Sequence, residues 1–216
     1  MSAPEHNVWK SVTSQNPDHA IRYAERWRNL ERAGHDIHGE ARLVDALAER
    51  GSRILDAGCG SGRLGGYLAR RGHQVIGIDH DPYLISVAQE DHPTAQWVVG
   101  DLATFQLQTD TGLAKFDHIV SAGNVMTFLA GHERLPSLQR LHEHLADDGR
   151  ITIGFGAGRG YDFAEFEADA LDAGLVIDAK FSTWQLAPAN ENFLVAFLSK
   201  ASKHTPVNPG VQVNIG

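Results

Sequence analysis

One stretch of the chain reads Arg53-Ile54-Leu55-Asp56-Ala57-Gly58-Cys59-Gly60-Ser61-Gly62-Arg63-Leu64. A short apolar run ends in an acid, glycine then occupies every second position, and a helical pattern of apolar residues follows. This order predicts a strand, a glycine turn and a helix. Such a turn brings a ligand close to bare backbone, because glycine permits positive φ and the helix start offers unpaired N–H groups. The acid at Asp56 suits a cationic ligand or a role in orienting the turn, and it would repel a pyrophosphate.

Length, charge and cysteine content limit the class of protein. The chain has 216 residues, one cysteine and a formal net charge of −8. This length fits one domain with additions, and the acidic balance argues against nucleic acid or an anionic membrane as the main partner. A single cysteine excludes an intramolecular disulfide and fits a reducing compartment. Residues 1–7 are polar, and no apolar run approaches the length of a membrane span. We therefore expect a cytoplasmic protein with neither a membrane nor a nucleic-acid partner.

From Gly51 onward, helical patterns alternate with apolar runs. Gly51, Gly72, Gly149 and Gly174 each follow a helical pattern, as expected of helix C-caps. The apolar runs predict strands at 53–57, 74–79, 96–100, 116–122, 150–155, 175–181 and 193–198. The helical patterns predict helices at 17–32, 40–50, 82–90, 132–146 and 161–173. This alternation indicates a parallel, doubly wound sheet with helices on both faces, and the last two strands should form an antiparallel hairpin at one end.

Acids and small residues end the expected strands. Ligands of open α/β sheets bind at the carboxyl ends of the strands, so these residues should lie at the ligand site. Asp79 ends the second strand, where an acid can accept both hydroxyls of a ribose. Asp101 ends the third and is placed to accept from an adenine amine. The fourth ends in the small, polar run 121–124.

Two ligand classes compete for this arrangement. Gly60-x-Gly62-x-x-Gly65 matches the spacing of dinucleotide-binding loops. Counted from Gly58, however, Arg63 stands where the third glycine of that motif belongs. S-adenosyl-L-methionine (SAM) explains the acids better, because it has a ribose, an adenine amine and a zwitterionic tail but no phosphate.

The glycine motif, Leu55 to Gly62, resembles that of class I SAM-dependent methyltransferases, and Asp79 and Gly100-Asp101 resemble the ribose and adenine acids of that family. The resemblance covers roughly residues 51–200. It implies a seven-stranded, mostly parallel sheet of order 3-2-1-4-5-7-6 with the last strand antiparallel. The run 123–126, Gly-Asn-Val-Met, is similar to small uncharacterised bacterial methyltransferases, a match that implies no substrate.

The resemblance implies SAM as cofactor and S-adenosyl-L-homocysteine (SAH) as product. The turn would contact the methionine moiety, Asp79 the ribose, Asp101 and Leu102 the adenine, and backbone near Ser121 the amino group. The implied cofactor-binding residues are Asp56, Ala57, Gly58, Cys59, Gly60, Gly62, Asp79, His80, Leu84, Gly100, Asp101, Leu102, Ser121 and Gly123.

Methyl transfer requires an aligned acceptor and, for some acceptors, a base. The catalytic candidates are His38 and Glu40, which precede the first strand, and Asn124. Each has a structural alternative: an exposed turn residue, a first-turn helix carboxylate and a loop cap, respectively. The residues expected to line the acceptor pocket are Tyr23, Trp27, His35, Tyr161 and Trp184. No metal is expected, because the twelve histidines form no His-Glu-x-x-His pattern and there is no cysteine pair.

The sequence thus predicts a methyltransferase that acts on oxygen or nitrogen of a small molecule, as a monomer or homodimer. The alternatives are a protein or peptide methyltransferase and a non-catalytic SAM- or SAH-binding protein. Residues 1–50 should form a helical cap or lid, 51–200 the SAM-binding domain and 201–216 a polar tail. Within the cap, Tyr23, Trp27 and Leu30 recur at helical spacing. Within the tail, the alternating run 211–215 is of a kind that can add an edge strand to a neighbour.

Overall fold

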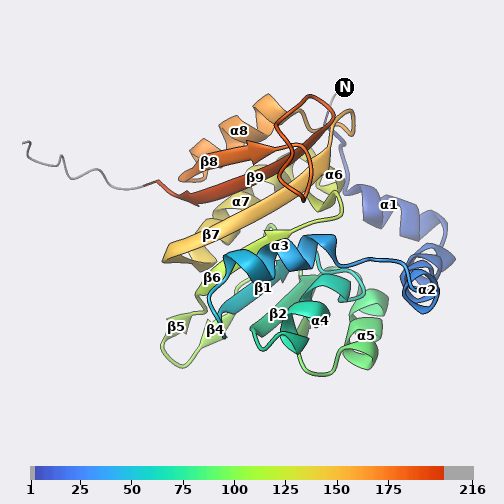
Figure 1. The fold of residues 1–216 in the computed structure, drawn as a ribbon. Coiled ribbons are helices and arrows are strands. Elements are labelled where there is room, and N and C mark those ends of the chain that lie inside the picture. The colour runs from blue at the N-terminus through green and yellow to red at the C-terminus, as the bar shows by residue number, and fades with distance from the viewer. Residues whose placement is uncertain (1–2, 202–216) are drawn as a thin grey trace, which may run out of the picture.

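The computed structural model describes residues 3–201, which form a seven-stranded sheet with helices on both faces (Figure 1). The helices are α1 (Val8–Gln15), α2 (Asp18–Arg32), α3 (Gly39–Leu47), α4 (Arg63–Arg70), α5 (Pro82–Asp91), α6 (Val125–Phe128), α7 (Gly131–His144) and α8 (Phe163–Asp172). The strands are β1 (Arg53–Ala57), β2 (Gln74–Asp79), β3 (Gln96–Val99), β4 (Gln108–Thr109), β5 (Gly112–Leu113), β6 (Phe116–Ser121), β7 (Leu145–Gly156), β8 (Leu175–Phe181) and β9 (Phe193–Lys200). The proposed tail, including 211–215, lies outside the described residues apart from Ala201.

The strand order is β3-β2-β1-β6-β7-β9-β8. When these seven strands are numbered consecutively along the chain, the order is 3-2-1-4-5-7-6, so the predicted topology is confirmed. Strand β1 pairs in parallel with β2 and β6, whereas β9 is antiparallel to both β7 and β8. The carboxyl ends of β1, β2, β3 and β6 therefore meet at one edge.

The two faces of the sheet bury separate apolar clusters. On one face, Leu138 of α7 and Phe166 of α8 pack with Ile119 and Ile151 of the central strands. On the other face, α3 and α4 pack with Ile54 and neighbouring strand residues. Successive residues of a strand point to opposite faces of the sheet. Because the strands are apolar on both faces, helices cover both sides of the sheet.

Short elements and two glycines differ from the sequence prediction. Helices α1 and α6 and the β4–β5 hairpin were not predicted, because elements of two to eight residues show too little periodicity. Gly51, Gly72 and Gly174 all have positive φ in the segment that follows a helix, as the C-cap prediction requires. Of these three, however, only Gly72 and Gly174 directly follow a helix cap, whereas Gly51 lies three residues beyond the cap of α3, Ala48, in a separate turn, so the C-cap prediction is wrong for Gly51. It is also wrong for Gly149, which lies inside β7. A Cβ there would stand 3.0 Å from the carbonyl oxygen of Phe116, so glycine permits close approach to β6.

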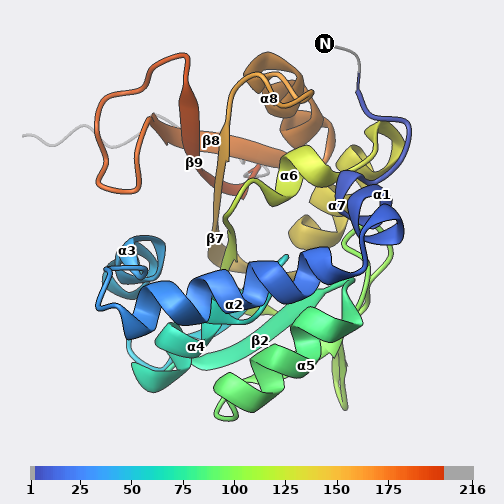
Figure 2. The same cartoon turned by 90° about the vertical axis from the view of Figure 1, so that its right-hand side faces the viewer.

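Helices α1 and α2 lie over the edge at which the strand ends meet. In Figure 2, α2 crosses in front of β2 and α4, with α1 beside its first turn and α3 beyond its last. The ring of Trp9 in α1 lies 5.2 Å from that of Tyr23 in α2, and both residues pack in a cluster with Leu84 of α5. The aromatic residues of α2 thus pack onto a neighbouring core and also lie across the edge of the sheet.

Candidate functional site

The glycine turn after β1 is fixed by backbone geometry. Gly58, Gly60 and Gly62 have φ values of 80°, 54° and 81°, all in the left-handed region. The backbone N–H groups of Gly58 and Cys59 donate to the carbonyl oxygen of Ile78 at 2.8 and 3.0 Å, which ties the turn to β2. A Cβ on Gly62 would come within 2.9 Å of the Trp97 ring. The turn therefore packs closely against the structure behind it.

Asp56 lies beneath this turn and orients the start of α4. Its Oδ2 accepts from the backbone N–H of Gly65 at 2.9 Å, and only 2% of the residue is exposed. Burial raises the pKa of this carboxyl group to about 7. The orienting role that the sequence left open for Asp56 is therefore present in the structure.

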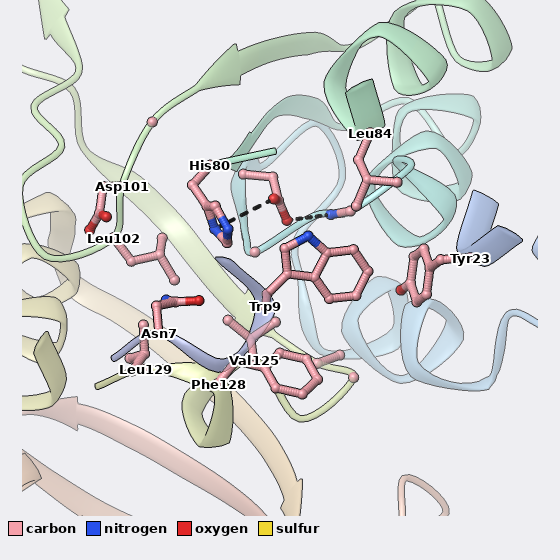
Figure 3. A pocket seen from close by; sticks show the side chains of 16 residues that line it. Asn7, Trp9, Tyr23, His80, Leu84, Asp101, Leu102, Val125, Phe128 and Leu129 are labelled. Carbon is pink, nitrogen blue, oxygen red and sulfur yellow. Dashed lines mark hydrogen bonds and ion pairs between the residues drawn. The ribbon is translucent and has the colours of Figure 1, made fainter. Parts of the chain in front are cut away.

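Asp79, at the end of β2, connects two backbone segments beside a cavity. Trp9, Leu84 and Leu102 point into the same cavity (Figure 3). The Oδ2 of Asp79 accepts from Gly60 N at 2.9 Å, and its Oδ1 accepts from Asp81 N at 3.0 Å. Burial raises the pKa of Asp79. We call this space the first cavity, and its lining residues are Asn7, Trp9, Tyr23, Gly58, Gly60, Asp79, His80, Leu84, Gly100, Asp101, Leu102, Ala122, Gly123, Val125, Phe128 and Leu129.

Helix α1 closes one side of the first cavity through polar contacts. The indole N–H of Trp9 donates to Asp81 Oδ2 at 2.8 Å, while Asp81 Oδ1 accepts from the first-turn N–H groups of α5. Lys10 pairs with Asp101 at 2.7 Å. Although partial burial raises the pKa of Asp101, the hydrogen bonds from Lys10 and from Ala103 N, with the charge of the lysine, together lower it. The acid expected to meet an adenine amine is thus already paired with a cation of α1.

A second cavity adjoins the first, and the two share Trp9, Tyr23, Gly58, Ala122, Gly123 and Phe128. Its other lining residues are His19, Arg22, Arg26, Trp27, Glu40, Asp56, Cys59, Ser61, Arg63, Leu64, Asn124, Trp184 and Phe193. Tyr23 lies between the two spaces, with its ring within 3.3 Å of where a Cβ on Gly60 would be. Burial raises the pKa of its hydroxyl group, so this hydroxyl is protonated at neutral pH.

Arg63 connects α4 to the cap. It forms two 3.0 Å hydrogen bonds with the carboxylate of Glu40, and it also donates to the carbonyl oxygen of Ile37. Its guanidinium lies 4.4 Å from the centre of the Trp27 ring. The first-turn carboxylate of α3 is therefore engaged in an ion pair at the wall of the second cavity.

Asn124 has φ of 67°, a conformation that asparagine tolerates better than most residues. Its Oδ1 accepts from the backbone N–H of Gly156 at 2.8 Å, joining the ends of β6 and β7. The loop-capping alternative for Asn124 is thus realised, and the residue also lines the second cavity.

Most of the predicted cofactor positions meet at these cavities. Nine of them line the first cavity, and Asp56 and Cys59 line the second. Ala57, Gly62 and Ser121 line neither. Cys59 is buried against Trp97, and burial raises the pKa of its thiol.

Three predicted residues lie elsewhere, and their placement in the site is corrected. Tyr161 is fully buried in the core, where its hydroxyl donates to Asp169 Oδ2 at 2.6 Å. His38 packs against the ring of Tyr67, with centroids 4.9 Å apart, and lines neither cavity. His35 lines two outer grooves, one of which shares four residues with the second cavity, but it lines neither cavity itself. Glu40 does line the second cavity, so closeness in sequence to Glu40 did not place these two histidines on the same wall.

Sequence analysis missed the contributions of α1 and of the arginines on α2. Asn7 and Trp9 belong to a helix that was not predicted. Arg22 and Arg26 were not predicted as site residues, although they lie one helical turn apart and directly precede the predicted Tyr23 and Trp27. That spacing was the available signal.

Within residues 3–201, no group of three or more His, Cys, Asp or Glu side chains is arranged to hold a metal ion. Over the same residues, no helix has the length and apolar character needed to cross a membrane.

Known proteins match both the sequence and the fold. A family model described as a methyltransferase domain matches residues 54–149. The chain is similar to the TehB-like SAM-dependent methyltransferase from Corynebacterium glutamicum, with 53% sequence identity and a TM-score of 0.81, over 86% of this chain and 100% of that chain. It shares the fold of a S-adenosylmethionine-dependent methyltransferase from Clostridium acetobutylicum at 12% identity and a TM-score of 0.71, over 84% of this chain and 99% of the other.

A curated relative matches a shorter part. Magnesium-protoporphyrin O-methyltransferase from Rhodobacter capsulatus is 36% identical over 120 residues, which are 53% of this chain and 48% of that protein. The chain thus spans about half the length of this relative.

Proposed function

This chain belongs to the SAM-dependent methyltransferases, and from that premise we propose that it transfers a methyl group from SAM to oxygen or nitrogen of a small-molecule acceptor. The observation that supports this proposal is the pair of adjoining cavities over the carboxyl ends of β1, β2, β3 and β6. One has a strand-end acid and small backbone positions, and the other has aromatic and charged walls.

We assign the adenosine part of SAM to the first cavity. Asp79 would accept from the ribose hydroxyls, and Leu84 and Leu102 would contact the adenine. The residues fit such a group, because His80 Nε2 is buried and has no hydrogen-bond partner among residues 3–201. Gly123 has open space where a Cβ would be, which permits close approach of a ligand to its backbone.

We assign the methionine part and the acceptor to the second cavity. When bound, SAM supplies a methyl group on a sulfonium, from which the methyl group can be transferred to the acceptor by in-line displacement. The chain's own residues align the acceptor and exclude water, since Tyr23, Phe128 and other aromatic rings line the junction of the cavities. Glu40 remains a candidate for holding an acceptor proton, although it is paired with Arg63.

Residues 1–50, which include α1, α2 and α3, serve in this proposal as a cap on the SAM-binding domain of residues 51–200. The cap supplies Trp9, Tyr23, Trp27 and Glu40 to the two cavities. It leaves room for a small acceptor rather than a docking platform, which favours a small molecule over a protein substrate.

The test is calorimetric titration of the protein with SAM, SAH and NADH in parallel. Binding of SAM and SAH alone is expected. Binding of NADH instead would mean that the loop accepts a pyrophosphate and would refute the proposal. Binding of SAM without transfer to any member of an acceptor library would favour the non-catalytic alternative.

A further inference from the structure

The second cavity has a cationic rim in a chain of negative net charge. Arg22, Arg26 and Arg63 line it, together with His19, whereas the whole chain has a formal charge of −8. The only carboxyl groups among its lining residues are Glu40 and Asp56. A concentration of arginine against the overall charge indicates a site for an anion.

Pairing leaves part of this positive charge uncompensated. Glu40 neutralises Arg63 through two hydrogen bonds. Arg22 has only a distant, exposed partner, Asp18, at 3.9 Å. Arg26 has no carboxylate within 4.0 Å among residues 3–201. Asp56 contributes only part of a negative charge at neutral pH, because burial raises its pKa to about 7.

Bound SAM would not neutralise this positive charge. Its carboxylate and ammonium cancel, and its sulfonium adds one positive charge. Coulombic repulsion therefore disfavours a cationic acceptor, and an anionic one is attracted. The cofactor's single carboxylate can occupy one arginine and leaves the other available.

The walls below the rim are flat and aromatic. Trp27, Phe128, Trp184 and Phe193 line the same cavity, and the guanidinium of Arg26 lies 5.8 Å from the Trp27 ring centre. Aromatic side chains favour planar ligands. Arginine binds carboxylates in a planar, two-point arrangement.

We propose that the methyl acceptor is a planar organic acid whose carboxylate binds Arg26, assisted by Arg22, and whose ring lies against the aromatic wall of the second cavity. This inference rests on the proposed function and specifies its substrate class. In the reaction, a hydroxyl or amine of the acceptor forms a bond to the methyl carbon, the S–CH3 bond breaks, and SAH and one proton are released.

The probes are 3,4-dihydroxybenzoate and its uncharged counterpart, 3,4-dihydroxybenzamide, titrated into the SAH-loaded protein. A charged hydrogen bond should make the acid bind at least about tenfold more tightly than the amide. Arg26→Gln should abolish this preference and leave SAH affinity unchanged. Arg32→Gln is the matched control, because Arg32 lies on the same helix, bonds to Asn29 and lines neither cavity.

Equal binding of acid and amide, or binding of neither, overturns the proposal. A second arm tests whether Arg26 instead serves the cofactor, using 5′-methylthioadenosine, which lacks the amino-acid tail. If Arg26→Gln weakens SAH and leaves 5′-methylthioadenosine unchanged, the arginine holds the cofactor's carboxylate and the proposal is wrong. Failure of the wild-type protein to bind SAM or SAH is a different result, because it refutes the proposed function and this inference with it.

Discussion

The two cavities differ in what builds them. The first is lined largely by strand ends and by backbone of the glycine turn, held by hydrogen bonds such as Gly60 N to Asp79. The second is lined by long side chains from α2, α3 and α4 and from the loops near Trp184 and Asn124. Backbone geometry tolerates few replacements, whereas long side chains can be exchanged without altering the fold. The cofactor side should therefore be sensitive to small changes, and the acceptor side should determine specificity.

Gly62→Ala should show the largest effect, because the turn packs closely on the side away from the ligand. Left-handed φ costs roughly 1–2 kcal/mol for alanine, and the methyl group would stand 2.8 Å from Ala88 Cβ. Overpacking adds to this cost, and we expect a total loss of about 2–4 kcal/mol in the free energy of unfolding. Urea unfolding measures it.

Gly51→Ala is the matched control. Gly51 has φ of 76°, close to the 81° of Gly62, but nothing lies within 4 Å of its would-be Cβ. The free energy of unfolding should therefore fall only by the cost of left-handed φ for alanine, about 1–2 kcal/mol. Equal losses for the two variants would show that the turn is not packed as tightly as the contacts indicate.

Asp79→Ala tests the ribose assignment of the first cavity. Removing a buried, charged acceptor should weaken SAH binding by about 1.5–3 kcal/mol, measured by calorimetry. Asp101→Asn is the comparison, because Asp101 is partly exposed and already paired with Lys10. It should lose less than about 1 kcal/mol, as exposed ion pairs contribute little. A larger loss of SAH affinity for Asp101→Asn than for Asp79→Ala would mean that the main polar contact to the cofactor lies at the end of β3 and not at the end of β2.

Sequence reasoning succeeded where backbone determines the structure. The glycine turn and the acids at Asp56, Asp79 and Asp101 follow directly from the apolar runs and their ends. The strand order was implied by the family resemblance, and the structure has that order. It failed where side chains from distant segments meet. The position of His38 depends on how the turn before α3 packs on Tyr67, and that contact has no signature in local periodicity.

The second cavity was also poorly predicted, because its walls depend on contacts between distant segments. Neither helical spacing nor composition indicates that Arg63 pairs with Glu40, or that Arg26 has no carboxylate partner in the described part of the chain. Tyr161 was misplaced for a related reason, because a polar aromatic residue after a strand is compatible with both a pocket and a core.

Asp56→Asn tests the buried carboxyl group that lines the second cavity. Burial raises its folded-state pKa to about 7, whereas the unfolded value is near 3.8. The unfolded chain therefore binds fewer protons between these values, and this group's contribution to stability is lost as pH rises from about 4 to about 7. Relative to the variant, the wild type should lose up to about 1.4 kcal/mol per pH unit in this window.

The measurement is urea unfolding of the cofactor-free wild type and variant at pH 5, 6, 7 and 8. The asparagine can still accept from Gly65 N, so the variant keeps the bond that orients α4. A difference between the two proteins that does not change with pH would mean that Asp56 is ionised throughout and that its burial is incomplete in solution.

His38→Ala should have the smallest effect. It tests whether the acceptor site extends beyond the residues that line the second cavity. His38 and Glu40 are close in sequence at the start of α3, but only Glu40 lines the second cavity. Glu40→Gln removes the charge that neutralises Arg63 and should lower turnover through displacement of the cap. His38→Ala removes packing on Tyr67 and a 3.7 Å contact with Glu31, both outside the cavities. It should leave SAH affinity and turnover within about twofold of wild type, a change of less than about 0.5 kcal/mol by the tenfold-per-1.4 kcal/mol relation. SAH formation with the organic acid that the wild type methylates measures both variants. A large loss for His38→Ala with unchanged SAH binding would restore His38 as the base and would require the turn before α3 to move toward the cavity during turnover.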